Sequence, residues 1–424
     1  MSIEQLYKIY RQNPGVQTDT RKLRTNDIFF ALKGNNFNGN EFAAKALEMG
    51  AAFAVVDEAA YFTRPDKMML VDDALETLQQ LALEHRKQLN IPVLAITGTN
   101  GKTTTKELIN AALSAGLKTY ATEGNLNNHI GVPLTILSIR PDVEIAVIEM
   151  GANHQLEIAS YCKIALPTHG IITNIGKAHL EGFGGEEGVK KAKGELYDFL
   201  RATNGTVFVC HDYNYLVEMS KGIPHIITYG NKDADYTGTP AADTAFLGVQ
   251  VNGEAGFIQT QLVGAYNFPN VMAAIAVASH FKVPPAKAAA AIAAYTPSNN
   301  RSQVIRQGSN TIIMDAYNAN PSSMKAAIDN FAGIQAPKKV LLLGAMMELG
   351  ADSIREHEAL VAMLERTHWD AVVLVGGDFK KITHPYIYLE NSAEAGKWLQ
   401  QQQLQDTYIL IKGSRSTGME KVLA

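Results

Sequence analysis

The sequence predicts an α/β fold of three domains, and three observations support this prediction. From residue 91 onward, short apolar runs alternate with helix-like stretches, which is the pattern of βαβ units around a mainly parallel sheet. The pattern breaks at 296–300, where Pro and Asn favour a turn, and then resumes. The length of 424 residues suits two or three domains of ordinary size. We therefore expect domains at 1–88, 89–297 and 298–424.

Each predicted element follows from its residues. In the small N-terminal α/β block, the run GAAFAVVDE at 50–58 predicts a strand, and Lys87–Asn90 is the predicted linker. In the central block, strands are predicted at Ile91–Thr97, Ile145–Met150, Gly170–Asn174 and Val207–Cys210. Helices on both faces of this sheet are predicted at Lys102–Ala115, Gly188–Leu200, Asn270–Phe281 and Pro285–Tyr295. The polar, Gly- and Thr-rich stretch Asp233–Val263 predicts short antiparallel strands.

The last block repeats the alternation and predicts a Rossmann-like domain. Its strands are expected at Thr311–Asp315, Lys339–Gly344, Ala371–Gly376 and Tyr408–Lys412, with helix-like segments between them.

The composition is that of an ordinary globular protein and argues against several classes. Lys and Arg number 38 against 42 Asp and Glu, a net charge of −4 without a basic block, so we expect no nucleic-acid binding. Two cysteines, Cys162 and Cys210, are too few for a disulfide framework or a four-thiolate zinc site. No apolar run approaches the roughly 18–20 residues that span a bilayer, and the N-terminus does not resemble a signal peptide. We therefore expect a cytoplasmic monomer that does not insert into membranes.

The segment TGTNGKTT at 97–104 carries the strongest functional signal. It follows an apolar strand and opens a helix, so that glycines can wrap an anion and helix N–H groups can point at it. Lys102 can reach the β and γ phosphates of a nucleotide, and the Thr103 hydroxyl can hold Mg²⁺. Ile96 stands where the standard Walker pattern has its first glycine. The strand, loop and helix context nevertheless favours a P-loop-type phosphate site over a glycine-rich turn.

Three further residues, which follow later in the central block, are candidates for the same phosphate site. Glu149 ends an apolar strand, where a carboxylate faces the ligand crevice, and we favour a metal role over a solvated acid. His179 follows the next strand; a lone histidine is more often an ordinary core or surface residue than a ligand. Lys193 lies beside Lys190 and Lys191, so its spacing alone is that of a solvated basic face.

The remaining candidates lie at a helix entry and at strand ends. Asn267 and Asn270 stand at the entry to an apolar helix, where helix capping and hydrogen bonding to a base are equally consistent with the spacing. Asp315 ends one predicted strand, and Lys412 and Arg415 end the last one. Two cations there favour a carboxylate or phosphate ligand over surface charge.

Taken together, these segments resemble the Mur ligase family. The shared elements are GTNGKTTT from Gly98, Glu149, the stretch Asn174–His179, Lys193, Asn267, Asn270 and Arg301. The more selective stretches are EGNLNNHIGVPLTIL from Glu123, DAYNANPSSMKAAI from Asp315 and KGSRSTGMEKV from Lys412. The segment QTDTRKLRTNDIFFALKGNNFNGNEF from Gln17 is similar to the uridine-diphosphate-binding region of that family. The resemblance covers essentially the whole chain.

The resemblance implies an ATP-dependent amide ligase of peptidoglycan and cell-wall synthesis. ATP would phosphorylate the terminal carboxylate of UDP-N-acetylmuramoyl-tripeptide, and the amine of D-alanyl-D-alanine would attack the acyl phosphate. The products would be the UDP-muramoyl-pentapeptide, ADP and phosphate. One alternative is a sister ligase that adds a single amino acid to a UDP-muramoyl peptide, or glutamate to folate. The other is a nucleotide-switched binding protein.

The same resemblance implies a role for each site residue. ATP would be held by Gly98, Thr99, Asn100, Gly101, Lys102, Thr103, Thr104, Asn267, Asn270, Arg301 and Asp315. Mg²⁺, expected as two ions, would be held by Thr103, Glu149, His179 and a carbamylated Lys193, and the catalytic residues would be Lys102, His179 and Lys193. The uridine nucleotide would lie near Thr20, Arg21, Lys33, Gly34 and Asn38. The peptide and dipeptide would contact Asn127, Asn128, Tyr317, Asn318, Lys412 and Arg415.

Three segments depart from the pattern usual in the family. Ala345 stands where an acidic residue is usual, Asn38 and Asn40 stand where Asp and His are commoner, and Thr20 stands where Ser is commoner but keeps the hydroxyl. Because an acyl phosphate hydrolyses in water, we also expect the C-terminal domain to close over the central one.

Overall fold

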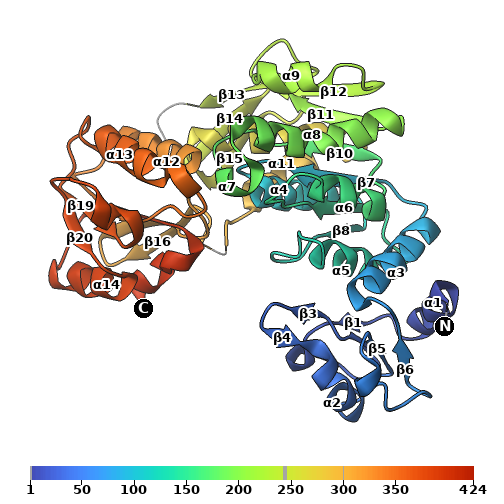
Figure 1. Cartoon of the computed structure of the whole chain (residues 1–424). Helices are drawn as coiled ribbons and strands as arrows, with labels where there is room; N and C mark the ends of the chain where they lie inside the picture. Colours follow the sequence, from blue (N-terminus) through green and yellow to red (C-terminus); the bar gives the residue numbers. More distant parts are fainter. Residues whose placement is uncertain (1, 242–245, 299) are drawn as a thin grey trace.

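The computed structural model in Figure 1 describes residues 2–241, 246–298 and 300–424. Asn299, in the predicted break at 296–300, lies outside these ranges. Three main sheets follow one another along the chain, and most of their neighbouring strands are parallel. This arrangement confirms the predicted α/β class. Each predicted domain range contains one of these sheets, and the boundaries at 88 and 297 remain predictions.

The N-terminal sheet is parallel, in the order β1-β2-β5-β6. These strands are β1 (Val16–Gln17), β2 (Ile28–Phe30), β5 (Phe53–Val56) and β6 (Met68–Leu70). A separate hairpin is formed by β3 (Lys33–Gly34) and β4 (Phe37–Asn38). The helices are α1 (Ile3–Gln12), α2 (Ala43–Glu48) and α3 (Ala74–Gln88). The predicted linker at Lys87–Asn90 thus begins within α3, which Asp73 caps by accepting a hydrogen bond from the Glu76 N–H.

Helix α3 fixes the N-terminal block to the central one, as Figure 1 shows near α5 and α6. The buried guanidinium of Arg86 donates hydrogen bonds to four carbonyl oxygens, including those of Ala165 at 2.8 Å and Leu166 at 3.2 Å. The Tyr10 hydroxyl donates to the carbonyl of Leu137 at 2.5 Å. These bonds cross from the first block to the second, so the two form one packed unit.

The central sheet has the order β15-β14-β13-β12-β11-β10-β7-β9-β8. Its parallel part comprises β7 (Val93–Thr97), β8 (Thr119–Ala121), β9 (Ile145–Glu149), β10 (His169–Ile172), β11 (Thr206–Cys210) and β12 (His225–Gly230). The predicted antiparallel region is confirmed as β13 (Tyr236–Ala241), β14 (Phe246–Val251) and β15 (Phe257–Val263). Strand β7 is fully buried, as a central parallel strand covered on both faces must be.

Helices pack against both faces of this sheet. On one face α4 (Lys102–Ser114) packs against α10 (Phe268–His280) and α11 (Pro285–Ala294). On the other, α6 (Glu157–Ala165) packs against α8 (Glu186–Ala202) and α5 (Gly131–Leu137). The short helices are α7 (Leu180–Phe183) and α9 (Asn214–Ser220). The site therefore lies where loops leave the carboxyl ends of β7, β9 and β10.

The C-terminal sheet has the order β16-β17-β21-β18-β19-β20 and is parallel except at the β16–β17 edge. Its strands are β16 (Gln303–Gln307), β17 (Asn310–Asp315), β18 (Lys338–Gly344), β19 (Ala371–Val375), β20 (Ile387–Leu389) and β21 (Thr407–Lys412). Its helices are α12 (Pro321–Gly333), α13 (Ser353–Leu364) and α14 (Ser392–Gln401). Among the described residues, no helix is both long and apolar enough to cross a bilayer.

Candidate active site

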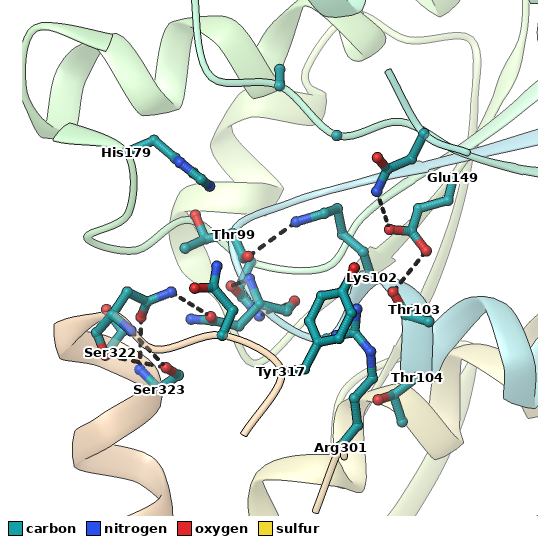
Figure 2. Close-up of a pocket in the computed structure, with 18 of the residues that line it drawn as sticks. Thr99, Lys102, Thr103, Thr104, Glu149, His179, Arg301, Tyr317, Ser322 and Ser323 are labelled. Carbon is teal, nitrogen blue, oxygen red and sulfur yellow. Dashed lines mark hydrogen bonds between the residues drawn. The ribbon is translucent and has the colours of Figure 1, made fainter. Parts of the chain in front are cut away.

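A cavity of about 700 Å³ lies between the central and C-terminal domains, and Figure 2 shows its lining. Most of the predicted site residues line it, namely Thr99, Asn100, Gly101, Lys102, Thr103, Thr104, Asn127, Asn128, Glu149, His179, Asn267, Asn270, Arg301, Asp315, Tyr317, Asn318 and Lys412. Gly98, Lys193 and Arg415 are not among its lining residues. The cavity therefore gathers side chains from segments more than 300 residues apart in the sequence.

The loop between β7 and α4 has the shape of an anion cradle. Gly98 has φ +141°, and a Cβ there would lie 2.0 Å from the Thr173 hydroxyl, so a larger residue does not fit. Gly101 has φ +78°, a conformation that side chains disfavour, and α4 begins directly after it. The Lys102 ammonium donates to the carbonyl oxygens of Gly98 at 2.8 Å and Thr99 at 3.1 Å. Burial lowers the pKa of Lys102.

Glu149 is buried at the end of β9 and receives two side-chain hydrogen bonds. The Thr103 hydroxyl donates to Oε2 at 2.8 Å, and the Asn127 amide donates to Oε1 at 2.7 Å. A hydroxyl and a carboxylate are hard oxygen donors, so Thr103 and Glu149 fit the ligand chemistry of Mg²⁺. His179 and Glu149 lie on opposite sides of Lys102 in the view of Figure 2. In the part of the chain that the structure describes, no cluster of three or more His, Cys, Asp or Glu side chains is preformed for a metal.

Lys193 differs from the solvated lysine that its spacing suggests. It lies on α8 with only 2% of its surface exposed, and its Nζ donates to the carbonyl of Ala152 at 3.2 Å. The same Nζ lies 4.9 Å from the centre of the Phe183 ring. Burial, together with the charge of Lys102, lowers the pKa of Lys193 to about 7. The amine is thus buried and loses its proton more readily than an ordinary lysine.

Asn267 and Asn270 form a buried chain of amides, and neither makes a side-chain capping bond. Asn270 lies inside the first turn of α10, and Asn267 occupies its N-cap position without such a bond. The Thr105 hydroxyl donates to Oδ1 of Asn270 at 3.0 Å, and Nδ2 of Asn270 donates to Oδ1 of Asn267 at 2.9 Å. Of the two interpretations that the sequence left equal, helix capping is wrong.

The C-terminal domain contributes a charged pair and a stacked tyrosine. Asp315 and Lys412 are partners at the ends of β17 and β21, and Nζ of Lys412 lies 2.6 Å from Oδ2 of Asp315. The guanidinium of Arg301 lies 3.6 Å from the centre of the Tyr317 ring, and that of Arg415 lies 5.3 Å from it. Arg415 therefore reaches the site through Tyr317, which does line the cavity.

Several contacts that the sequence did not predict join the two domains at this cavity. Nδ2 of Asn320 donates to Oδ1 of Asn100 at 2.8 Å. The Lys177 N–H donates to the Ser322 hydroxyl at 3.1 Å, and Nζ of Lys177 lies 2.9 Å from Glu356. Each contact links residues well over a hundred positions apart, so only the folded chain reveals it. These contacts hold the C-terminal domain against the phosphate loop.

A second cavity of about 470 Å³ lies at the β3–β4 hairpin and is lined by Lys33, Gly34 and Asn38 among others. Phe37 and Phe42 stack beside it with ring centres 5.4 Å apart. Thr20 and Arg21 do not line this cavity, and Arg21 pairs instead with Asp19 at 2.8 Å.

The unusual Asn40 is buried next to this hairpin, and both polar atoms of its side chain form hydrogen bonds. Its Nδ2 donates to Oδ1 of Asp57 at 2.7 Å, and its Oδ1 accepts from the Asp57 N–H at 3.0 Å. Asn40 therefore holds Asp57, whose carboxylate lies 3.2 Å from Nζ of Lys33.

Comparison with known proteins identifies the family. The chain matches the Mur ligase family catalytic domain at residues 14–99, the Mur ligase middle domain at 96–278 and the Mur ligase glutamate ligase domain at 300–415. It is 36% identical to the UDP-N-acetylmuramoyl-tripeptide–D-alanyl-D-alanine ligase of Bacillus subtilis, covering 85% of this chain and 80% of that protein. The chain belongs to the Mur ligase family.

Other Mur ligases are similar along nearly their whole length. The ligase of the same name from Escherichia coli is 34% identical, with 96% of this chain and 92% of that protein covered. The crystal structure of MurF from Acinetobacter baumannii is 31% identical with a TM-score of 0.87, covering 98% of this chain and 97% of that one. The MurF ligase from Thermotoga maritima in complex with ADP is 27% identical with a TM-score of 0.85, covering 97% and 96%.

Proposed function

We propose that this Mur ligase uses ATP to join D-alanyl-D-alanine to UDP-N-acetylmuramoyl-tripeptide. The observation that carries the proposal is the match along nearly the whole chain to relatives and structures bearing this name. The cavity supports it, because a phosphate loop from one domain and cations from another surround a single space. A ligase that transfers a phosphoryl group needs such an enclosed, cationic space.

The phosphate loop binds ATP in this proposal. The N–H groups at the start of α4 and the Lys102 ammonium bind the phosphates, so Lys102 exchanges its bonds to Gly98 and Thr99 for bonds to phosphate oxygens. Asn267 and Asn270 present donors and acceptors for the base, and Arg301 and Asp315 complete the nucleotide site. The ADP in the Thermotoga maritima structure supports the assignment of an adenine nucleotide.

Mg²⁺ is the metal ion that we propose for this site. Thr103, Glu149 and His179 would surround one ion, and a carbamylated Lys193 would bind a second. When bound, Mg²⁺ neutralises charge on the phosphates. The carbamate forms when the neutral Lys193 amine adds CO₂ and loses one proton, which turns a buried cation beside Lys102 into an anion.

The reaction then has two steps. A carboxylate oxygen of the tripeptide attacks the γ-phosphorus of ATP, the bond to the β-phosphate oxygen breaks, and ADP leaves. The amine of the dipeptide then attacks the acyl carbon, loses a proton and expels phosphate. Tyr317, Asn318, Lys412 and Arg415 orient the dipeptide from the C-terminal side, and Asn127 and Asn128 orient the tripeptide from the central side.

The uridine diphosphate binds in the hairpin cavity in this proposal, where Lys33, Gly34 and Asn38 lie. Thr20 and Arg21 lie outside that cavity and would approach the nucleotide from the neighbouring turn. We also propose a cytoplasmic location, because both cysteines are buried free thiols that suit a reducing compartment. We further propose that the protein acts as a monomer.

Phosphate release from Mg-ATP tests the proposal when each acceptor is omitted in turn. We expect release only with both UDP-muramoyl-tripeptide and D-Ala-D-Ala, and a product heavier by the dipeptide. Release with a single amino acid would instead assign a sister ligase, and hydrolysis indifferent to both acceptors would support a nucleotide switch. Lys102→Ala should abolish release, whereas the control Lys118→Ala, an exposed surface change, should not.

A further inference from the structure

The contact between His179 and Glu348 crosses from the central domain to the C-terminal one. Oε2 of Glu348 approaches Nδ1 of His179 to 2.5 Å. This nitrogen is buried and makes no hydrogen bond of complete geometry among the described residues, so Glu348 meets it as a close charged contact. His179 also lines the cavity, and Figure 2 shows its ring directed toward the phosphate loop. The Glu348 carboxylate, which belongs to the C-terminal domain, thus lies at the Nδ1 edge of the His179 ring.

The loop that carries Glu348 is anchored on both sides of it. The Met346 N–H donates to Nε2 of the buried His357 at 3.1 Å, and the Met347 N–H donates to the Ser414 hydroxyl at 3.0 Å. On the other side, a Cβ on Gly350 would lie 3.1 Å from the Cβ of Glu181, so the loop packs closely on the segment after His179. The position of Glu348 is therefore set by its own domain and fitted to its neighbour.

Both partners hold a backbone conformation that side chains disfavour. His179 has φ +51° and Glu348 has φ +62°. A non-glycine residue in this region costs about 1 kcal/mol, and such conformations persist only where the surroundings fix them. Their occurrence at both ends of one contact indicates that the contact is specified by the fold.

A carboxylate at Nδ1 has a definite consequence for the ring. It favours the tautomer with the proton on Nδ1, which leaves the lone pair of Nε2 free as an acceptor. Carboxylates that bond a histidine in this way orient the ring and fix which nitrogen binds a cation. Here the carboxylate comes from a different domain, so the ring is oriented only when the two domains are together.

We propose that Glu348 is a positioning residue for His179, delivered by the C-terminal domain, so that domain closure completes a cation site. The inference rests on the proposed function, which gives His179 a role beside Mg²⁺. The competing explanation is a simple latch, in which Glu348 only holds the domains together. Glu356 offers the matched comparison, because its contact with Lys177 joins the same segment to the same domain without touching His179.

The test measures Mn²⁺ binding by electron paramagnetic resonance in the presence of a non-hydrolysable ATP analogue. We expect Glu348→Gln to weaken Mn²⁺ binding by about tenfold, the effect typical of losing such a supporting contact. Glu356→Gln should bind Mn²⁺ as the wild type does. In a His179→Ala background, Glu348→Gln should have no further effect, because it acts through the ring.

Three results would overturn the proposal. The first is wild-type Mn²⁺ affinity in Glu348→Gln, or no Mn²⁺ binding by the wild type. The second is an equal loss in Glu356→Gln, which would establish the latch. The third is an effect of Glu348→Gln that persists without His179. Because this readout uses no amine or peptide substrate, a chain that behaves as expected here but fails the phosphate-release assay would refute only the proposed reaction.

Discussion

Lys193 gives the sharpest prediction for the proposed ligase, because burial makes its amine reactive. Its pKa of about 7 lies well below the ordinary lysine value of 10.5. At pH 8, about 90% of such amines are neutral, against about 0.3% for an ordinary lysine. Only the neutral amine adds CO₂, and about 300-fold more of the Lys193 amine than of a surface lysine is in this form at pH 8. The carbamate should therefore form at Lys193 and should decline as the pH falls through about 7.

Carbon-13 NMR of protein equilibrated with labelled bicarbonate measures this directly. We expect a carbamate resonance in the wild type that is missing from Lys193→Gln, which should also lose ligase activity. The N-terminal α-amino group, with a pKa of about 8, gives a signal common to both proteins. Lys106 and Lys412 serve as internal comparisons, because they are as buried as Lys193 but pair with Glu107 at 2.7 Å and Asp315 at 2.6 Å. Identical carbamate resonances in the wild type and in Lys193→Gln at pH 8 would refute the reasoning.

Three predictions concern the stability of the fold. Arg86→Met should cost about 3 kcal/mol and lower the thermal midpoint by about 3–5 °C, because buried carbonyls lose a charged donor. Leu156→Gly should stabilise the protein by about 1 kcal/mol in thermal unfolding, because Leu156 is 71% exposed and has φ +71°. In denaturant unfolding, the wild type should lose about 3 kcal/mol of its free energy of unfolding as the pH falls from about 6.5 to about 4. His169→Phe should not show this loss. Burial, with His280 adding to it, lowers the pKa of His169 to about 4, so the unfolded chain takes up this proton first.

Each of these predictions has a result that contradicts it. An unchanged midpoint in Arg86→Met would mean that its hydrogen bonds contribute nothing net. Leu156→Ala is the control for Leu156→Gly, since it removes the side chain but keeps the Cβ; equal stability of the two would exclude backbone strain. If His169→Phe loses as much stability as the wild type when the pH is lowered, another group must titrate in this pH range.

The main strands were predictable because their residues leave little choice. The run at Ile145–Met150 is apolar and β-branched, and β9 occupies all but its last residue. Strand β8 was missed because its residues Thr119–Ala121 are only half-buried and form no apolar run. Helix α3 was not predicted, although Asp73 and Glu76 carry a capping signal at its start.

Only those parts of the site that lie in short sequence motifs could be predicted. The phosphate loop could be predicted, because the spacing of its glycines and lysine lies within one short stretch of sequence. The burial of Lys193 could not be predicted, since its neighbours Lys190 and Lys191 suggest a solvated face. The contact of Glu348 had no local signal, because its partner lies 169 positions earlier and on another domain. Likewise, Ala345 is fully buried, so a longer acidic side chain there would need space that this chain does not leave.

The bonds from α3 and α1 to the central domain have a consequence for substrate choice. Because Arg86 and Tyr10 fasten the N-terminal block, the hairpin cavity keeps a constant separation from the phosphate loop. Under the proposed function, that separation sets the distance required between the uridine end of the substrate and its reacting carboxylate. A UDP-muramoyl peptide one residue shorter would bind by its nucleotide, but its carboxylate would fail to reach ATP.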